Sequence, residues 1–475
     1  MESGGRLTGK RIATIDCESP SDASLFVNKL SPLRQSRIWT PDFPVSPQRW
    51  PFFYGWMIVA VATVGIVFSI PGQTMGFSVF TDILIEKLGL TRVQLSTAYC
   101  VGTVLSGLSL PALGRVFDRF GARKLMVGSA VATGLVLFYL SLTHRLLAWL
   151  DGLFDFVSRT AIAFGLMALG FYLIRVSAQG VLTMTCRNAI GKWFDYHRGT
   201  ALAVSGTVTA FTFSVAPKGL NFLIERFEWW GAWVFLGVLS ICFMAVIGWV
   251  FLRDNPEECG LEMDGPRGTG IRREAHADSI AHRDYERHEA LRTWAFWVFN
   301  LSFAFFAMFS TAFTFHVVSL GEEFGRARED IINYFIPMAL LSVVTNLFCG
   351  WFSSRTRLKY LLMLMNFGAL IGVAGTMTLN TGPGLAAYII GNGVCGGCFS
   401  ALTGIVWPRF FGRRRLGAIA GIGMSSMVIA SGTGPLMFSL SLSWAESYRP
   451  ILWFCAAIPA ILLVGSGWAD NPQRR

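Results

Sequence analysis

The sequence predicts an all-α membrane protein with twelve transmembrane helices in two bundles of six. Three observations lead to this prediction. The 475-residue chain is 53% hydrophobic and only 15% charged, whereas soluble proteins carry about 25% charged residues. Apolar runs of about 20 residues, which is the length that crosses the hydrocarbon core as a helix, recur along the chain. One long polar segment, residues 253–293, separates these runs into two groups of six.

The apolar runs are continuous and lack the alternation of barrel strands. A helix satisfies its own backbone hydrogen bonds in lipid, so each run is expected to be helical. The twelve expected spans cover residues 54–80, 95–115, 125–142, 161–186, 201–224, 230–252, 294–320, 331–352, 360–379, 385–407, 416–442 and 450–468.

Basic residues predict the orientation. With both termini in the cytosol, cytosolic segments hold 30 of the 40 Lys and Arg residues, outer loops hold 8, and Arg175 and Lys218 lie within spans. The positive-inside rule favours this arrangement. We therefore expect an integral, multi-pass protein of a plasma or inner membrane.

The expected parts of the chain are a cytosolic N-terminal tail (1–53), a six-helix bundle (54–252), a cytosolic linker (253–293), a second six-helix bundle (294–468) and a cytosolic C-terminal tail (469–475).

The sequence offers no candidate for catalysis or for a cofactor. The net charge of +11 is spread over many short loops, which favours anionic lipid headgroups over nucleic acid as its partner. A G-x-G-x-x-G match at Gly391–Gly396 and a C-x-x-C pair, Cys395 and Cys398, lie inside one apolar span without a preceding strand, so neither predicts a nucleotide or metal site. We expect no enzyme activity, no cofactor and no metal.

A glycine- and arginine-rich motif stands between the second and third spans. The stretch "GRVFDRFGARK" resembles the loop signature of the major facilitator superfamily, G-x-x-x-D-R-x-G-x-R-[KR]. The matching residues are Gly114, Asp118, Arg119, Gly121, Arg123 and Lys124. A short loop with one carboxylate and several guanidinium groups can latch the inner ends of helices through charge pairs and helix dipoles. The alternative is a plain positive-inside loop, which would need neither the glycines nor the acid.

The second half carries a degraded copy of this motif. In "GWFSSRTRLK", residues 350–359, Ser354 occupies the Asp position and Arg357 the glycine position. The copy indicates internal duplication, but the missing acid argues against a second latch. Two parallel six-helix halves are a transporter architecture, in which substrate binds near the midplane between them.

Three further stretches narrow the resemblance. "YGW" at residues 54–56, "KWFDYHRGTALAVSG" at 192–206 and "RDNPEECG" at 253–260 resemble the branch of monocarboxylate transporters and oxalate/formate antiporters. This resemblance implies an organic anion as substrate, moved by proton symport or by exchange. The chain departs from the branch where the eighth span usually carries an arginine, because Ser342 and Asn346 stand there. The eleventh span also lacks the lysine that the antiporters use.

Arg175 is the main candidate for binding an anion. It lies about 21 Å and 16 Å from the two ends of the span 161–186, too far for its side chain to reach water. An arginine at that depth costs about 2.5–3.5 kcal/mol, so a partner or a wet cavity is expected. Tyr172, Gln179 and Thr183 share its helix face. Two interpretations stay open: Arg175 binds a substrate carboxylate through its planar fork, or it ties the fourth span to a neighbouring helix.

Other polar residues within spans are weaker candidates for the pore. They are Gln73 near Pro71 in the first span, Asn300 and His316 in the seventh, and Asn346 in the eighth. Structural roles are an alternative for each. No Asp or Glu lies centrally in any span, so proton coupling would need His316 or a proton carried by the substrate itself.

Together these observations predict a carrier that moves a small organic anion, such as a monocarboxylate, by alternating access. Arg175 is the expected charge partner, with Gln179, Tyr172, Gln73, Asn346, His316 and Asn300 as further lining residues. Protons are the expected coupling partner if the carrier is a symporter. Two alternatives stay open: a solute sensor that binds without net transport, and a carrier for a neutral solute.

Overall fold

The computed structural model describes residues 37–154, 156–265, 281–326 and 328–474. Within these ranges the chain is almost entirely helical and contains no strand. Most of the expected N-terminal tail, the middle of the expected linker and the final residue of the C-terminal tail lie outside the described residues.

The first six expected spans all fall on helices. The first span is α2 (Gly55–Val67) with η3 (Ile70–Gly72) and α3 (Thr74–Ser78), and the second and third spans are both in α5 (Arg92–Ser141). The fourth span is α7 (Arg159–Ile174) with the π-helix η4 (Arg175–Leu182) and α8 (Thr183–Trp193). The fifth and sixth spans are in α9 (Arg198–Leu239) with η5 (Ser240–Ala245) and α10 (Val246–Phe251). Two short helices, α4 (Thr81–Leu88) and α6 (Thr143–Asp151), lie between spans.

Two of these helices are each a pair of helices joined by a sharp turn. Gly121 in α5 has φ 83° and Glu228 in α9 has φ 60°, so the helix axis is interrupted at both residues. Among the described residues, nine helical segments are long and apolar enough to cross a membrane, and Gly55–Val67 is a shorter apolar helix. Since α5 contains two spans, and α9 with η5 and α10 contains two more, the prediction of twelve transmembrane helices agrees with these segments.

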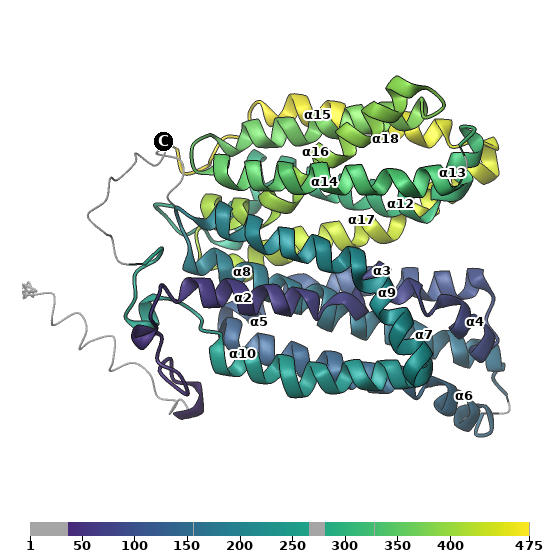
Figure 1. The fold of residues 1–475 in the computed structure, drawn as a ribbon, viewed down its shortest axis with the longest axis horizontal. Coiled ribbons are helices and arrows are strands. Elements are labelled where there is room, and N and C mark those ends of the chain that lie inside the picture. The colour runs from purple at the N-terminus through teal and green to yellow at the C-terminus, as the bar shows by residue number, and fades with distance from the viewer. Residues whose placement is uncertain (1–36, 155, 266–280, 327, 475) are drawn as a thin grey trace, which may run out of the picture.

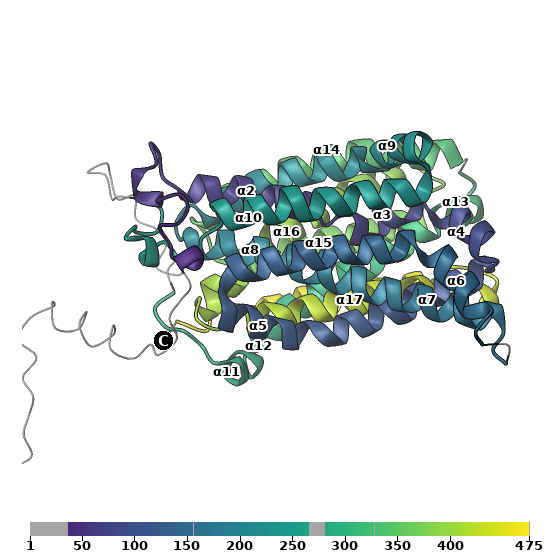
Figure 2. The same ribbon diagram turned by 90° about the horizontal axis from the view of Figure 1, so that it is seen from below.

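The last six expected spans correspond to one helix each. They are α12 (Trp294–Phe315), α14 (Arg328–Ser353), α15 (Leu358–Met377), α16 (Gly382–Phe411), α17 (Leu416–Ala445) and α18 (Arg449–Ser466). Two short helices, α11 (Arg287–Leu291) and α13 (Val317–Glu323), precede and follow α12. In Figure 1 the green and yellow helices of this half lie together above the purple and teal helices of the first half. Figure 2 shows the long helices running roughly along one axis.

Short linker segments lie at one end of the molecule, together with the turn at Gly121. We call this end, on the left of Figure 1, the linker end, and the opposite end the far end. The carboxylate of Asp264 accepts hydrogen bonds from the backbone N–H groups that open α9, those of residues 195–197. The carboxylate of Asp284 accepts from the corresponding groups of Arg413 and Arg414 before α17. Asp264 therefore fastens the first described segment of the linker to the first half and Asp284 fastens the second segment to the second half, while Glu257 of the first segment also pairs with Arg413 at 2.8 Å.

Glycines bring the two halves into backbone contact at the linker end. A Cβ added to Gly114 on α5 would lie 2.1 Å from the carbonyl oxygen of Gly417 on α17, and one on Gly199 of α9 would lie 2.2 Å from that of Gly350 on α14. Only small residues allow helices to approach so closely. The two contacts join the second span to the eleventh and the fifth to the eighth, as expected for duplicated halves.

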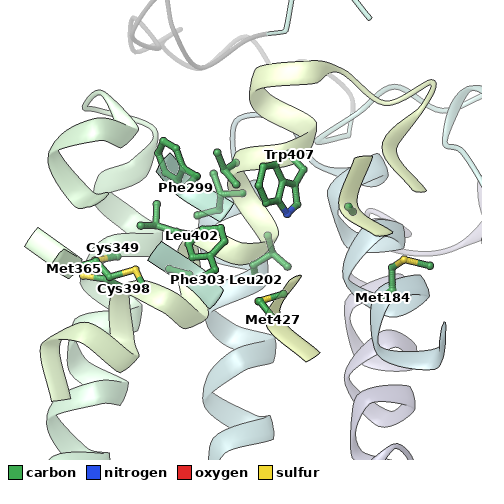
Figure 3. Packing of buried hydrophobic residues seen from close by; sticks show 14 of the residues in the cluster. Met184, Leu202, Phe299, Phe303, Cys349, Met365, Cys398, Leu402, Trp407 and Met427 are labelled. Atoms are coloured by element: carbon green, nitrogen blue, oxygen red, sulfur yellow. Dashed lines mark hydrogen bonds between the residues drawn. The ribbon is translucent and has the colours of Figure 1, made fainter. Parts of the chain in front are cut away.

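Aromatic and sulfur-containing side chains pack between helices of the second half, notably α12 and α16. Figure 3 shows Phe299 and Phe303 of α12 packed beside Leu402 and Trp407 of α16. The rings of Phe303 and Trp407 meet edge to face with centroids 5.9 Å apart. Lipid is as apolar as these side chains, so close packing rather than exclusion of water stabilises this core.

Candidate functional site

Arg175 begins the π-helix of the fourth span and is buried, with 2% of its surface exposed. Its Nε donates a hydrogen bond to Thr103 Oγ1 at 3.1 Å, Nη1 donates to Gln179 Oε1, and Nη2 donates to the hydroxyl of Tyr99. The guanidinium carbon also lies 4.7 Å from the centroid of the Tyr99 ring. All of these partners are neutral, so the positive charge is solvated by dipoles and carries no carboxylate partner among the described residues.

Gln179 lies four residues after Arg175, within the π-helical turn. The fourth-span stretch "RVSAQG" has one residue more than the arginine–glutamine–glycine spacing it resembles. A π-helix widens the turn and absorbs an extra residue, and such turns are frequent at functional sites. Residues 175–182 form this turn. The four-residue spacing therefore places the amide of Gln179 beside the guanidinium.

A polar chain connects Arg175 to the exposed side chain of Thr74 on α3. The Tyr99 hydroxyl, which accepts from Arg175, is also 2.7 Å from the Thr74 hydroxyl. Thr74 is exposed and Tyr99 is partly exposed. Thr103, the third partner, packs against Gly432 of α17 in the other half, since a Cβ on Gly432 would lie 3.3 Å from its methyl group. The Arg175 site therefore borders the interface between the halves.

The other candidates from the first half lie near Arg175 without contacting it. Gln73 donates to the hydroxyl of Ser69 at 3.1 Å within the kinked first span. Tyr172, one turn before Arg175, places its hydroxyl 3.0 Å from that of Ser109 on α5. Of the predicted polar face, Gln179 is the member that bonds the guanidinium.

Asn300 and Asn346 bind neighbouring helices. Asn300 donates to the Ser426 hydroxyl of α17 at 2.9 Å, and Asn346 donates to the carbonyl of Ala203 at 3.1 Å across the two halves. The side-chain oxygen of each is buried and has no hydrogen-bond partner. A buried acceptor without a partner is costly, so both oxygens can accept from a ligand or water.

His316 is fixed at the far end, directly after α12. Its Nε2 lies 3.0 Å from the carbonyl of Pro435, and its Nδ1 lies 3.1 Å from the Tyr448 hydroxyl. Both ring nitrogens are thus engaged with α17 and the start of α18. The structure does not bring His316 together with Arg175.

Asp118 joins the two halves at the linker end. Its carboxylate accepts hydrogen bonds from the backbone N–H groups of Gly417 and Ala418, both at 2.8 Å. These residues form the first turn of α17, where unpaired N–H groups and the helix dipole favour a negative charge. A helix-dipole contact across the halves is therefore present at the predicted loop.

The basic residues of the loop have other partners. Arg123 is 2% exposed and donates to the carbonyl groups of Thr40, Phe43 and Trp249. Lys124 lies 5.7 Å from the ring of Trp39, and the exposed Arg119 lies 5.4 Å from the ring of Phe120. Arg123 and Lys124 thus hold the N-terminal segment and the end of the sixth span within the first half.

Replacing Gly121 by alanine is expected to destabilise the protein by about 1–3 kcal/mol. The residue has φ 83°, and a Cβ there would lie 2.6 Å from the carboxylate of Asp254. Thermal unfolding in detergent would measure the loss. Gly128→Ala is the matched control, because Gly128 lies in the same helix with open space around it; it should leave stability unchanged or raise it slightly. Equal midpoints for both variants would contradict this account of the turn.

A family model for the major facilitator superfamily matches residues 57–391, which is more than half of the chain. The chain belongs to the major facilitator superfamily. Comparison with curated proteins gave no match. Membership of this family of transporters agrees with the expectation of a membrane-embedded transporter rather than an enzyme.

Solved structures show the same major facilitator fold. A bacterial homologue of the iron transporter ferroportin in an outward-facing state has a TM-score of 0.60 at 15% identity, covering 87% of this chain and 98% of that chain. The human organic anion transporter MFSD10 (TETRAN) has a TM-score of 0.57 at 16% identity, covering 86% of this chain and 98% of that chain. At these identities the likeness establishes the fold alone.

The sequence did not predict a second deep cation of this major facilitator, Arg187. The expected fourth span ends at residue 186, but the helix continues through α8 to Trp193. Arg187 therefore lies inside the bundle and donates to Thr403 Oγ1 of α16 at 2.8 Å, across the two halves. A signal existed in the sequence, since "TCRNAIGKW" continues the apolar helix for two more turns.

Proposed function

We propose that this membrane transporter carries a small organic anion by alternating access, with Arg175 as the charge partner of the substrate carboxylate. One observation carries the proposal: a buried guanidinium in the fourth span is bonded to three neutral side chains and to no carboxylate within the described residues. Placing a charge at this depth is costly. A substrate that brings the opposite charge would offset that cost.

The geometry of Arg175 supports a defined exchange of partners. Nη1 and Nη2, held by Gln179 and Tyr99, form one edge of the guanidinium, while Nε is held by Thr103. A carboxylate binds such an edge through two parallel hydrogen bonds, which are about twice as strong as bonds to neutral acceptors. The substrate would displace the amide and the phenol, and the Nε bond would keep the arginine oriented.

The position of Tyr99 supports access from the far end. Its hydroxyl lies between the guanidinium and the exposed Thr74. Rotation of Tyr99 would open the way to Arg175, while Asp118 and the glycine contacts keep the linker end closed. We assign the linker end to the cytosol because of the distribution of basic residues. Among the described residues, no group of three His, Cys, Asp or Glu side chains could hold a metal ion, so no such group supports a metal ion as the transported substrate.

Counterflow in proteoliposomes would test the substrate class. Vesicles preloaded with unlabelled formate, lactate or oxalate should take up the same labelled acid in a saturable manner, and vesicles loaded with glycerol should not. Net uptake into vesicles that hold no acid, driven by an imposed proton gradient, would separate symport from exchange, because only symport gives this uptake and a protonophore abolishes it. Counterflow of glycerol alone would make the protein a carrier of neutral solutes, and ligand-induced thermal stabilisation without flux would make it a sensor.

A further inference from the structure

Arg187 is a cation inside a membrane-spanning helix that links the two halves. It lies on α8 in the first half, and its hydrogen bond to Thr403 reaches α16 in the second half. The same face of α8 continues to Gly191, where a Cβ would lie 3.2 Å from Pro408 of α16. The helices therefore touch at Gly191, and Arg187 lies one turn further from the linker end.

The guanidinium of Arg187 has few partners for its depth. Arg253, which is buried, donates to five backbone carbonyl groups, whereas Arg187 donates to the single hydroxyl of Thr403. An arginine has five N–H donors, so most of its hydrogen-bonding capacity is unused.

Arg187 also keeps accessible surface, unlike Arg175. Its exposure is intermediate although it lies deep among the spans, whereas Arg175 is 2% exposed. Apolar side chains flank it: Met184 precedes it by three residues on the same helix face, and Trp407 follows Thr403 by four. Figure 3 shows Met184 of the first half to the right of Trp407 and Met427 of the second half. This environment suits a carboxylate attached to a small apolar group.

We propose that Arg187 is a second anion-binding residue, which takes the substrate carboxylate in exchange for Thr403 as the halves separate at the linker end. The inference rests on the proposed transport of an organic anion. By helix rise, Arg187 lies about 18 Å closer to the linker end than Arg175. The bond to Thr403 crosses the interface, so an anion that replaces it binds more tightly to the state in which the halves are apart. This difference in affinity couples substrate binding to opening.

Two substitutions that remove the same hydrogen bond would test the proposal. Arg187→Gln removes the charge, while Thr403→Val removes the acceptor and leaves the arginine. Counterflow of formate, lactate and oxalate would be measured for both variants and for Arg187→Lys, alongside thermal unfolding. We expect Arg187→Gln to raise KM about 10- to 100-fold, the value of a lost charge-assisted bond. Thr403→Val should change KM by less than about 3-fold, and Arg187→Lys should give an intermediate value because it keeps the charge without the fork.

The outcomes separate this inference from the proposed function. If Arg187→Gln and Thr403→Val raise KM equally and lower the midpoint of thermal unfolding equally, the hydrogen bond only stabilises the contact between the halves. That result would overturn the inference about Arg187 and leave the proposed anion transport intact. A wild-type protein that exchanges none of the three acids would overturn both. A rise in KM for the acids in Arg187→Gln but not in Thr403→Val would support the second anion site, provided that Arg187→Gln is folded and shows no counterflow of glycerol.

Discussion

Replacing Arg175 by glutamine is expected to reduce carboxylate counterflow at least about 30-fold, because truncating one partner of a buried charge pair costs about 2–5 kcal/mol. Glutamine can still bond neutral neighbours such as Thr103, so the helix packing survives better than the charge. Initial rates over a range of substrate concentrations would show whether the loss appears in KM, as expected for a residue that binds the carboxylate.

Two further variants distinguish binding from packing at Arg175. Tyr99→Phe keeps the ring against the guanidinium and removes the hydroxyl that accepts from Nη2; we expect less than about a 5-fold change, since the substrate displaces this hydroxyl in any case. Arg175→Lys keeps the charge without the planar fork and should fall between wild type and Arg175→Gln. Unchanged uptake in Arg175→Gln would remove the main support for an anionic substrate.

Apolar length and polar breaks were sufficient to predict the helices. Each expected span falls on a helix because a membrane leaves the backbone no other internal solution. Helix ends were harder to predict. The expected fourth span ends at residue 186, before Arg187, yet α8 continues to Trp193. A charge that is bonded across the interface can lie deeper than such a rule allows.

Partners of the candidate residues could not be predicted, because they come from distant parts of the chain. Periodicity placed Gln179 near Arg175, but Tyr99 and Thr103 lie more than 70 residues earlier. Tyr172 shares the predicted face, yet its hydroxyl lies beside that of Ser109 on α5. A one-dimensional pattern describes a helix face, and which helix packs on that face depends on the tertiary fold.

The latch shows the same limit. The sequence indicated that Asp118 with its neighbouring arginines could fasten helix ends by charge pairs or dipoles. In the structure Asp118 accepts from Gly417 and Ala418, about 300 residues away, and Arg123 serves the first half alone. Asp118 and the close approach of Gly114 to Gly417 therefore both act at the contact between α5 and the first turn of α17. A substitution that disturbs this backbone contact tests the latch more directly than removal of a single charge.

Replacing Gly417 by alanine is expected to open the linker end and to reduce exchange at least about 10-fold. The added Cβ would lie 2.3 Å from the carbonyl oxygen of Gly114, and a backbone atom cannot move aside as a flexible side chain can. Overpacking of this kind costs about 1–3 kcal/mol. The cost falls only on the state in which the halves touch, so the equilibrium shifts toward the open state by roughly 5- to 150-fold.

Spin labels at the exposed positions 119 and 414, on opposite halves at the linker end, would measure this shift directly. In Gly417→Ala the distance between the labels should lengthen and exchange should fall, because exchange requires the protein to return through the closed state. Gly128→Ala is the control, since the same methyl group is added where no atom lies within 4 Å. Asp118→Asn should lengthen the distance less, because an amide oxygen still accepts from one N–H but no longer carries the charge that the α17 dipole favours. A wild-type distance in Gly417→Ala would mean that the contact of Gly114 with Gly417 does not hold the halves together, and the loop would then have no role in alternating access.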